Sequence, residues 1–322
     1  MNLLNEEPFI IQSLQKEIEI QHLNKNIVTC LILLSDGRIL TGHIGGGICL
    51  ISINILTKEW NIDIARNTET FHKRPQMIRK QWPVVALCEL QSNIIVSVSG
   101  QFANQIKLWL LSQEEIIEVG VLEGHTDKIT NILSISDDTL VSSSYDKTIR
   151  IWNYKECKEE AILHEESEVH CIHKLQSKEN VLVSGCNGYI GVWDNCSLVT
   201  RIPSGKDKVN HCIIEIMNGY LVVSQSYGNI IIVDYIKREI VKEIKDDIFC
   251  NDIHYFILCT YNDYSFIALI GNKRLVQIDT KDNEFNIIYK TDIQFGEVVV
   301  VKDKQYIITN NLAMGIDVYN SK

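Results

Sequence analysis

A short pattern repeats along this chain of 322 residues, and it limits the possible folds more than any other feature. Its best copy, at residues 122–153, reads LEGHTDKITNILSISDDTLVSSSYDKTIRIWN. Apolar residues alternate with polar ones along two stretches, which predicts strands, and the short Ser/Asp-rich segments between them predict turns. A unit of this size cannot bury both faces of its sheet alone. The sequence therefore predicts several such units packed side by side.

Seven copies of the pattern can be aligned. They lie at residues 39–52, 95–110, 140–153, 182–194, 221–234, 266–279 and 307–320. We call the position of Trp152, near the end of the third copy, the closing position. In the seven copies it is filled by Ile51, Trp109, Trp152, Trp193, Val233, Ile278 and Tyr319. The intervals between these residues are 58, 43, 41, 40, 45 and 41, which fits four-stranded units repeated about every 40–45 residues. The last three copies have no Trp at this position, so we expect those units to depend more on apolar packing.

The third copy resembles a repeat of the WD-repeat family, because it begins with the pair Gly124-His125 and closes on Trp152. The resemblance implies an all-β fold, a seven-bladed β-propeller, with residues 1–322 in a single domain. The repeat period, the strand alternation and the turn residues all agree with this architecture.

The same resemblance implies a hydrogen-bonded set of four residues in the third blade. We place this structural tetrad at His125, Ser142, Asp146 and Trp152. Asp146 would orient the imidazole, and Ser142 would link it to the indole N–H, so that each buried polar group has a partner. Ser, His and Asp together could also suggest a hydrolase, but no Gly-x-Ser-x-Gly motif accompanies them. We therefore predict a structural role for the tetrad and no catalytic residues.

Closure of the ring must use the start of the chain. After Tyr319 only three residues remain, too few for a fourth strand in the last blade. Upstream of the first predicted strand, the alternation in Glu17-Ile18-Glu19-Ile20 suits a half-exposed edge strand. In the WD-repeat family an N-terminal strand completes the last blade. We predict that residues 9–22 do so here.

The composition favours an intracellular protein. The net charge is −10, and no apolar run approaches the roughly 18 residues of a membrane span. The first residues lack the basic flank and apolar core of a signal peptide. None of the ten cysteines forms a Cys-x-x-Cys pair, so we expect free thiols in a reducing compartment. We expect a cytoplasmic or nuclear protein, the cytoplasm being favoured, that is monomeric and does not bind membranes.

The segment His170-Cys171-Ile172-His173 raises the question of a metal site. Residues three apart on a strand point to opposite faces, so only Cys171 and His173 could share a ligand, whereas zinc needs about four. We expect no metal and no cofactor. Packing explains the cysteine better, because one repeat position, two residues after the start of a first strand, is predicted to hold Cys30, Cys171 and Cys250. His211 is placed at the same position.

The long first interval contains an insertion, ARNTETFHKRPQMIRKQWP at residues 65–83, between blades 1 and 2. It has five basic residues against one Glu, a net charge of +4, which leaves −14 for the rest of the chain. Aromatic and basic side chains dominate interface hot spots. The candidate partner-binding residues in it are Arg66, Phe71, Lys73, Arg74, Arg79, Lys80 and Trp82. The alternative is a solvated loop whose length has drifted.

Aromatic residues in tight turns are a second candidate, because such turns favour Gly, Asn and Asp. Tyr145 and Tyr227 are predicted to be exposed on the same face as the insertion, and His43, Phe102 and Asn187 to be exposed in equivalent turns. Packing against a neighbouring loop is the alternative explanation.

These features favour a non-catalytic scaffold for protein–protein interactions. The basic insertion favours an acidic or phosphorylated segment of a partner protein, bound on the face that carries residues 65–83. Two alternatives stay open. One is a subunit of a ribonucleoprotein or another nucleic-acid assembly, which the low pI of about 5.4 disfavours. The other is an enzyme with an unrecognised site at the central channel, for which His211 and Asp207 are too isolated in the sequence to give support. The substrate-recognition subunit of a ubiquitin ligase is a special case of the scaffold.

Overall fold

A computed structural model gives the fold of the chain. It describes residues 14–20, 27–44, 46–54, 57, 59–66, 83–91, 93–99, 104–112, 115–216, 219–244, 257–262, 265–270, 274–279, 286–294, 299–302, 306–310 and 316–321.

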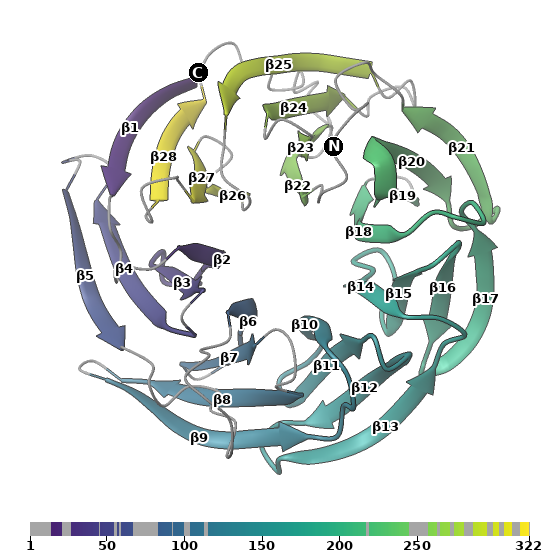
Figure 1. Cartoon of the computed structure of the whole chain (residues 1–322), viewed down its shortest axis with the longest axis horizontal. Helices are drawn as coiled ribbons and strands as arrows, with labels where there is room; N and C mark the ends of the chain where they lie inside the picture. Colours follow the sequence, from purple (N-terminus) through teal and green to yellow (C-terminus); the bar gives the residue numbers. More distant parts are fainter. Residues whose placement is uncertain are drawn as a thin grey trace, which may run out of the picture.

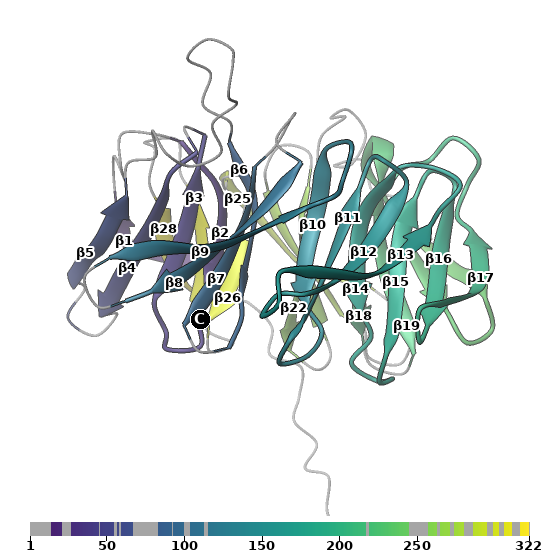
Figure 2. The same cartoon turned by 90° about the horizontal axis from the view of Figure 1, so that it is seen from below.

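The described strands form seven antiparallel sheets of four strands each, arranged as blades around a ring (Figure 1). The all-β, seven-bladed prediction is therefore confirmed. In six of the sheets the chain runs outward from the centre, so consecutive strands pair as hairpins and the last strand lies at the rim; in the seventh the rim strand is the N-terminal one. Figure 2 shows the ring from its edge, with one face above and one below.

Blades 1 to 4 take up the strands from β2 to β17. Blade 1 contains β2 (Val28–Leu33), β3 (Ile39–His43), β4 (Ile48–Asn54) and β5 (Glu59–Arg66). Blade 2 contains β6 (Val84–Glu89), β7 (Ile94–Ser99), β8 (Gln105–Leu111) and β9 (Ile116–Glu123). Blade 3 contains β10 (Ile129–Ser134), β11 (Thr139–Ser144), β12 (Thr148–Asn153) and β13 (Lys158–His164). Blade 4 contains β14 (Val169–Lys174), β15 (Val181–Cys186), β16 (Tyr189–Asp194) and β17 (Ser197–Pro203).

Blades 5 to 7 take up the remaining strands. Blade 5 contains β18 (Asn210–Ile216), β19 (Tyr220–Gln225), the 3₁₀ turn η2 (Ser226–Gly228), β20 (Asn229–Asp234) and β21 (Glu239–Ile244). Blade 6 contains β22 (Ile257–Asn262), β23 (Ser265–Ile270), β24 (Arg274–Asp279) and β25 (Asn286–Gln294). Blade 7 contains β26 (Val299–Lys302), β27 (Tyr306–Asn310), β28 (Ile316–Ser321) and the N-terminal strand β1 (Leu14–Ile20).

The ring closes as predicted, because β1 is the outer strand of the last blade. It pairs antiparallel with β28, with Ile18 opposite Val318 and Ile20 opposite Ile316. In Figure 1 the purple strand β1 lies beside the yellow strand β28, so the two ends of the chain complete one sheet. The strand covers residues 14–20 of the predicted 9–22, and the remaining residues of that range lie outside the described part of the chain.

The predicted register is also correct in all seven blades. In each one the closing position lies on the third strand, opposite an apolar residue on the second. The pairs are Ile39–Ile51, Ile95–Trp109, Leu140–Trp152, Leu182–Trp193, Leu221–Val233, Phe266–Ile278 and Ile307–Tyr319. All seven closing residues are buried, so each anchors the apolar layer between neighbouring blades.

Hydrogen bonds also join neighbouring blades near the central channel. In blades 1 to 5 the first strand has a register irregularity after its first residue, between Ile129 and Asn131 in blade 3. There the Thr130 hydroxyl donates to the Val169 carbonyl of blade 4 at 2.8 Å. The Cys171 thiol donates in the same way to the Asn210 carbonyl of blade 5, at 3.6 Å. Polar groups at the bulges are thereby paired across the blade junctions.

The prediction for the repeated cysteine is wrong in two details. Cys30 lies opposite Gly42 and Cys171 opposite Gly185, but the third member is Cys212, opposite Ser224. Cys250 precedes β22, which begins only at Ile257, and lies outside the described residues. His211 consequently occupies the position of His170 instead of that of Cys171.

Candidate functional site

One face of the ring carries the turns between second and third strands together with the connections to the next blade; we call it the hairpin face. The register shows why these two sets lie together. Arg66, at the end of β5, pairs with Ile48, and Ile48 pairs with Gly42 just before the β3–β4 turn. The chain therefore enters the insertion at residues 65–83 from the hairpin face.

In blade 3 the four tetrad residues form a continuous chain of hydrogen bonds. The Trp152 indole N–H donates to Ser142 Oγ at 2.8 Å, and the Ser142 hydroxyl lies 2.7 Å from His125 Nε2. His125 Nδ1 lies 2.8 Å from Asp146 Oδ2. With the Nδ1–H donating to the carboxylate, Nε2 accepts from the serine, and every link has one donor and one acceptor.

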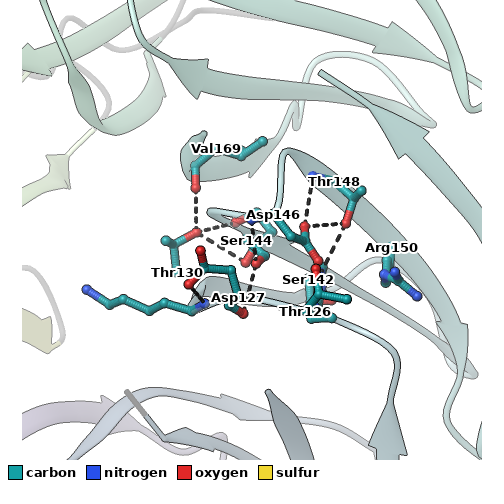
Figure 3. Close-up of polar contacts among 12 residues, drawn as sticks. Thr126, Asp127, Thr130, Ser142, Ser144, Asp146, Thr148, Arg150 and Val169 are labelled. Carbon is teal, nitrogen blue, oxygen red and sulfur yellow. Dashed lines mark hydrogen bonds and ion pairs between the residues drawn. The ribbon is translucent and has the colours of Figure 1, made fainter. Parts of the chain in front are cut away.

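Further donors hold Asp146 in its turn (Figure 3). The hydroxyl and the N–H of Thr148 donate to Oδ1 at 2.6 and 2.9 Å, and the Thr126 N–H donates to Oδ2 at 3.0 Å. Burial acts to raise the pKa of Asp146, but the hydrogen bonds from His125, Thr148 and Thr126 together lower it well below its usual range. Since Ser142 is fully buried, its hydroxyl cannot meet a substrate, and the geometry is that of a structural lock.

Blade 4 has a lock that the sequence pattern missed. Glu165 lies four residues before β14, the place that His125 has before β10. Its carboxylate accepts from Ser184 Oγ at 2.5 Å and from the Trp193 indole at 3.0 Å. It also accepts from the Tyr189 hydroxyl at 3.1 Å and from Arg201 Nε at 3.2 Å. The available signal was its spacing from β14, which equals that of the His in the Gly-His pair.

Local residues make room for this carboxylate. Gly191 lies opposite Ser184, where blade 3 has Arg150 opposite Ser142, and a side chain at Gly191 would collide with Glu165 and Ser184. Tyr189 remains a hydrogen-bond donor, because burial raises its pKa to about 12. The arrangement satisfies a buried charge with donors from three strands and a cation.

A second feature of the hairpin face is a row of ring contacts across blades 3, 4 and 5. The Tyr145 ring meets His170 edge-on at 5.0 Å between centroids, and His170 meets His211 at 5.8 Å. Lysine ammonium groups lie 5.2 Å from the Tyr145 and Tyr227 rings. We call this set the aromatic belt; it consists of Lys128, Tyr145, His170, His211, Lys208 and Tyr227.

The two turn tyrosines differ in how they are held. Tyr145 is half-buried against the next blade, as the packing alternative describes. Tyr227 is 65% exposed, and its backbone has the left-handed φ of 64° that non-glycine residues rarely adopt. It is the third residue of its turn, the place that Asp146 has in blade 3. An exposed aromatic ring in a strained turn is the kind of feature that function, more than folding, explains.

The other turn candidates are placed differently. His43 is fully buried and lies 3.0 Å from Thr41 Oγ1, so the prediction that it is exposed is wrong. Asn187 is exposed, and its Oδ1 lies 2.8 Å from His170 Nε2. Phe102 lies outside the described residues.

For the insertion, the structure describes only the points where the chain leaves and returns. The backbone of Arg66 ends β5, and the chain resumes at Pro83 before β6. Phe71, Lys73, Arg74, Arg79, Lys80 and Trp82 lie outside the described residues.

Among the described side chains, no group of three or more His, Cys, Asp or Glu residues is placed to hold a metal ion. No helix within the described ranges is both long enough and apolar enough to cross a membrane.

Comparisons with known proteins agree with this geometry. Residues 117–153 match the family model described as WD domain, G-beta repeat. The WD40 beta propeller domain of Doa1 superposes with a TM-score of 0.73 and 13% identity, over 97% of this chain and 98% of that domain. The chain folds as a WD-repeat β-propeller.

The sequence relatives of this WD-repeat propeller match only part of its chain. WD repeat-containing protein 37 of Homo sapiens is 25% identical over 99 residues, which is 30% of this chain and 20% of that protein. Coronin-7 of Bos taurus is 40% identical over 67 residues, 19% of this chain and 7% of that protein. The matched part thus spans a fifth or less of the length of these curated relatives, and the likeness is one of repeats.

Proposed function

We propose that this protein is a non-catalytic scaffold that binds an acidic or phosphorylated segment of a partner protein on its hairpin face. The observation that carries the proposal is the aromatic belt. Tyrosine rings with lysine ammonium groups beside them can bind both the apolar and the anionic groups of a peptide. Tyr227 is 65% exposed, so its ring is available to a ligand.

The basic insertion supports the same choice of partner. Its net charge of +4 contrasts with −14 for the rest of the chain, and it enters and leaves on the hairpin face. Positive charge concentrated in one segment of an otherwise acidic protein favours encounter with an acidic segment. The acidic remainder disfavours a long nucleic-acid backbone, for which positive charge would have to extend along the surface.

Affinity purification of the intact protein tests the proposal. One variant, Lys208→Glu with Tyr227→Ala, changes the belt, and a second reverses the charges of Lys73, Arg74, Arg79 and Lys80. Lys178→Glu is the matched control, because its ammonium group also lies over a tyrosine, Tyr235, at 5.4 Å, but on the opposite face. We expect proteins with acidic or phosphorylated segments to be lost from both test variants and retained by the control.

Two results would decide against the proposal. Identical proteins bound to the wild type and both test variants would show that the hairpin face does not select partners. Loss of the partners after nuclease treatment of the lysate would instead support the nucleic-acid alternative.

A further inference from the structure

The two histidines of the aromatic belt occupy one position of the repeat in adjacent blades. His170 is the second residue of β14 and His211 the second residue of β18. Their rings therefore meet at the junction of blades 4 and 5, with centroids 5.8 Å apart and planes at 78°. At this separation, positive charges on both rings would repel each other.

Charged and titratable groups from three blades surround His170. Tyr145 and Lys128 come from blade 3, and His211 comes from blade 5. On its own blade, the carboxylate of Glu168 lies 3.8 Å from Nε2, and Asn187 Oδ1 lies 2.8 Å from the same atom. The imidazole side chain is only 9% exposed, which makes its charge costly in the free protein.

The balance of these contacts favours the neutral imidazole. Burial lowers the pKa of His170 below its ordinary value of 6.5; the hydrogen bond with Asn187 opposes this, and the positive charge of Lys128 adds to it. A carboxylate or phosphate bound at the belt would reverse the last of these effects by neutralising Lys128. It would also place a negative charge near the ring, which favours the protonated form.

We infer that binding of an acidic segment at the aromatic belt is coupled to uptake of a proton by the His170–His211 pair. The inference rests on the proposed function and adds a regulatory property to the same site. The bound complex holds more protons than the free protein, so linkage requires that affinity increase as pH falls. The affinity should change mainly around the ordinary histidine pKa, from about pH 7.5 to about pH 5.5.

The test uses the full-length protein and a fluorescent oligo-glutamate peptide as the probe. Each unit by which the ligand raises a histidine pKa gives a tenfold gain in affinity, so we expect roughly tenfold tighter binding at pH 5.5 than at pH 7.5. His170→Gln keeps an amide beside Asn187 but cannot be charged, and it should remove most of this dependence. His211→Gln should reduce it. His164→Gln, which changes an exposed histidine outside the belt, is the matched control and should keep it.

Calorimetry on the wild type gives an answer even where a variant fails to fold. Titrations near pH 6.5 in buffers of different ionisation enthalpy measure the number of protons taken up, which we expect to be clearly above zero. Tight binding that does not change with pH, or without proton uptake, would overturn this inference and leave the proposed function standing. Absence of binding at both pH values would overturn both.

Discussion

In blade 3 the side chain four residues before the first strand is the imidazole of His125, and in blade 4 it is the carboxylate of Glu165. Both are buried, and both accept from the hydroxyl of a serine on the second strand. The tryptophan indole on the third strand donates to that serine in blade 3 and to the carboxylate in blade 4. In blade 3 the charged group is Asp146, on a turn at the hairpin face. The serine hydroxyl accepts from the tryptophan indole and donates to His125. In blade 4 the charge itself lies inside the blade.

The difference shows what this position of a propeller blade requires. It needs a buried acceptor for a serine hydroxyl; it does not need a histidine. A carboxylate provides this acceptor, but the ion loses hydration and then needs its own cation and further donors. Arg201 and Tyr189 supply these in blade 4, and Gly191 leaves the space. The four predictions below test this comparison.

The largest effect is expected from removing the cation of blade 4. Arg201→Met keeps an apolar stem of similar length but leaves Glu165 buried without its positive partner. The free energy of unfolding should fall by about 3–5 kcal/mol, the cost of an uncompensated buried charge. Urea denaturation measures it. Adding Glu165→Gln should recover most of the loss, and a double variant as unstable as Arg201→Met would show that the ion pair is not what holds the blade.

Deleting the two bridging serine hydroxyls should give unequal losses. Ser142→Ala leaves both His125 Nε2 and the Trp152 indole without their partner, so we expect a loss of about 2 kcal/mol. In Ser184→Ala the Trp193 indole still donates to Glu165 at 3.0 Å, and the loss should be about 1 kcal/mol. Equal shifts in the denaturation midpoint would contradict the assigned geometry.

Acid should weaken blade 3 through Asp146. The folded pKa of this carboxyl lies below its unfolded value of 3.8, so its ionised form stabilises the fold above about pH 4. This stabilisation is lost as the pH falls toward the folded pKa. Asp146→Asn cannot contribute it, so the gap in unfolding free energy between wild type and variant should narrow from pH 7 to pH 3. A constant gap would show that ionisation of Asp146 does not contribute to stability.

Much of this fold follows from the repeat pattern. Burying an apolar residue at one register position is a local requirement, so Trp152 and its six counterparts mark the third strands, and the interval between them counts the blades. The N-terminal closing strand was predictable because Glu17-Ile18-Glu19-Ile20, upstream of the first blade, alternate as an edge strand does. The position of β22 was not predictable, because several apolar residues before it could equally mark the start of a strand.

The lock of blade 4 and the belt were harder to predict, because each depends on contacts between distant segments. Apart from its spacing from β14, Glu165 has no sequence feature that shows burial until Arg201, 36 residues later, is known to reach it. His170 and His211 appeared inequivalent because an apolar residue is expected to start each first strand, whereas β18 begins at the polar Asn210, one residue after Val209. Only the paired register places their rings together.

The smallest effect concerns Tyr227, which stands in blade 5 where blade 3 has Asp146. A non-glycine residue with a φ of 64° is strained, and Gly adopts this conformation freely. Tyr227→Gly should therefore raise the free energy of unfolding slightly, by up to about 1 kcal/mol, while weakening the binding of an acidic peptide. Asp146→Gly, in contrast, should lower stability because it removes the partner of His125. If Tyr227→Gly were also destabilising, the contact between its ring and Lys208 would outweigh the strain, and the exposed tyrosine would be a packing element like Tyr145.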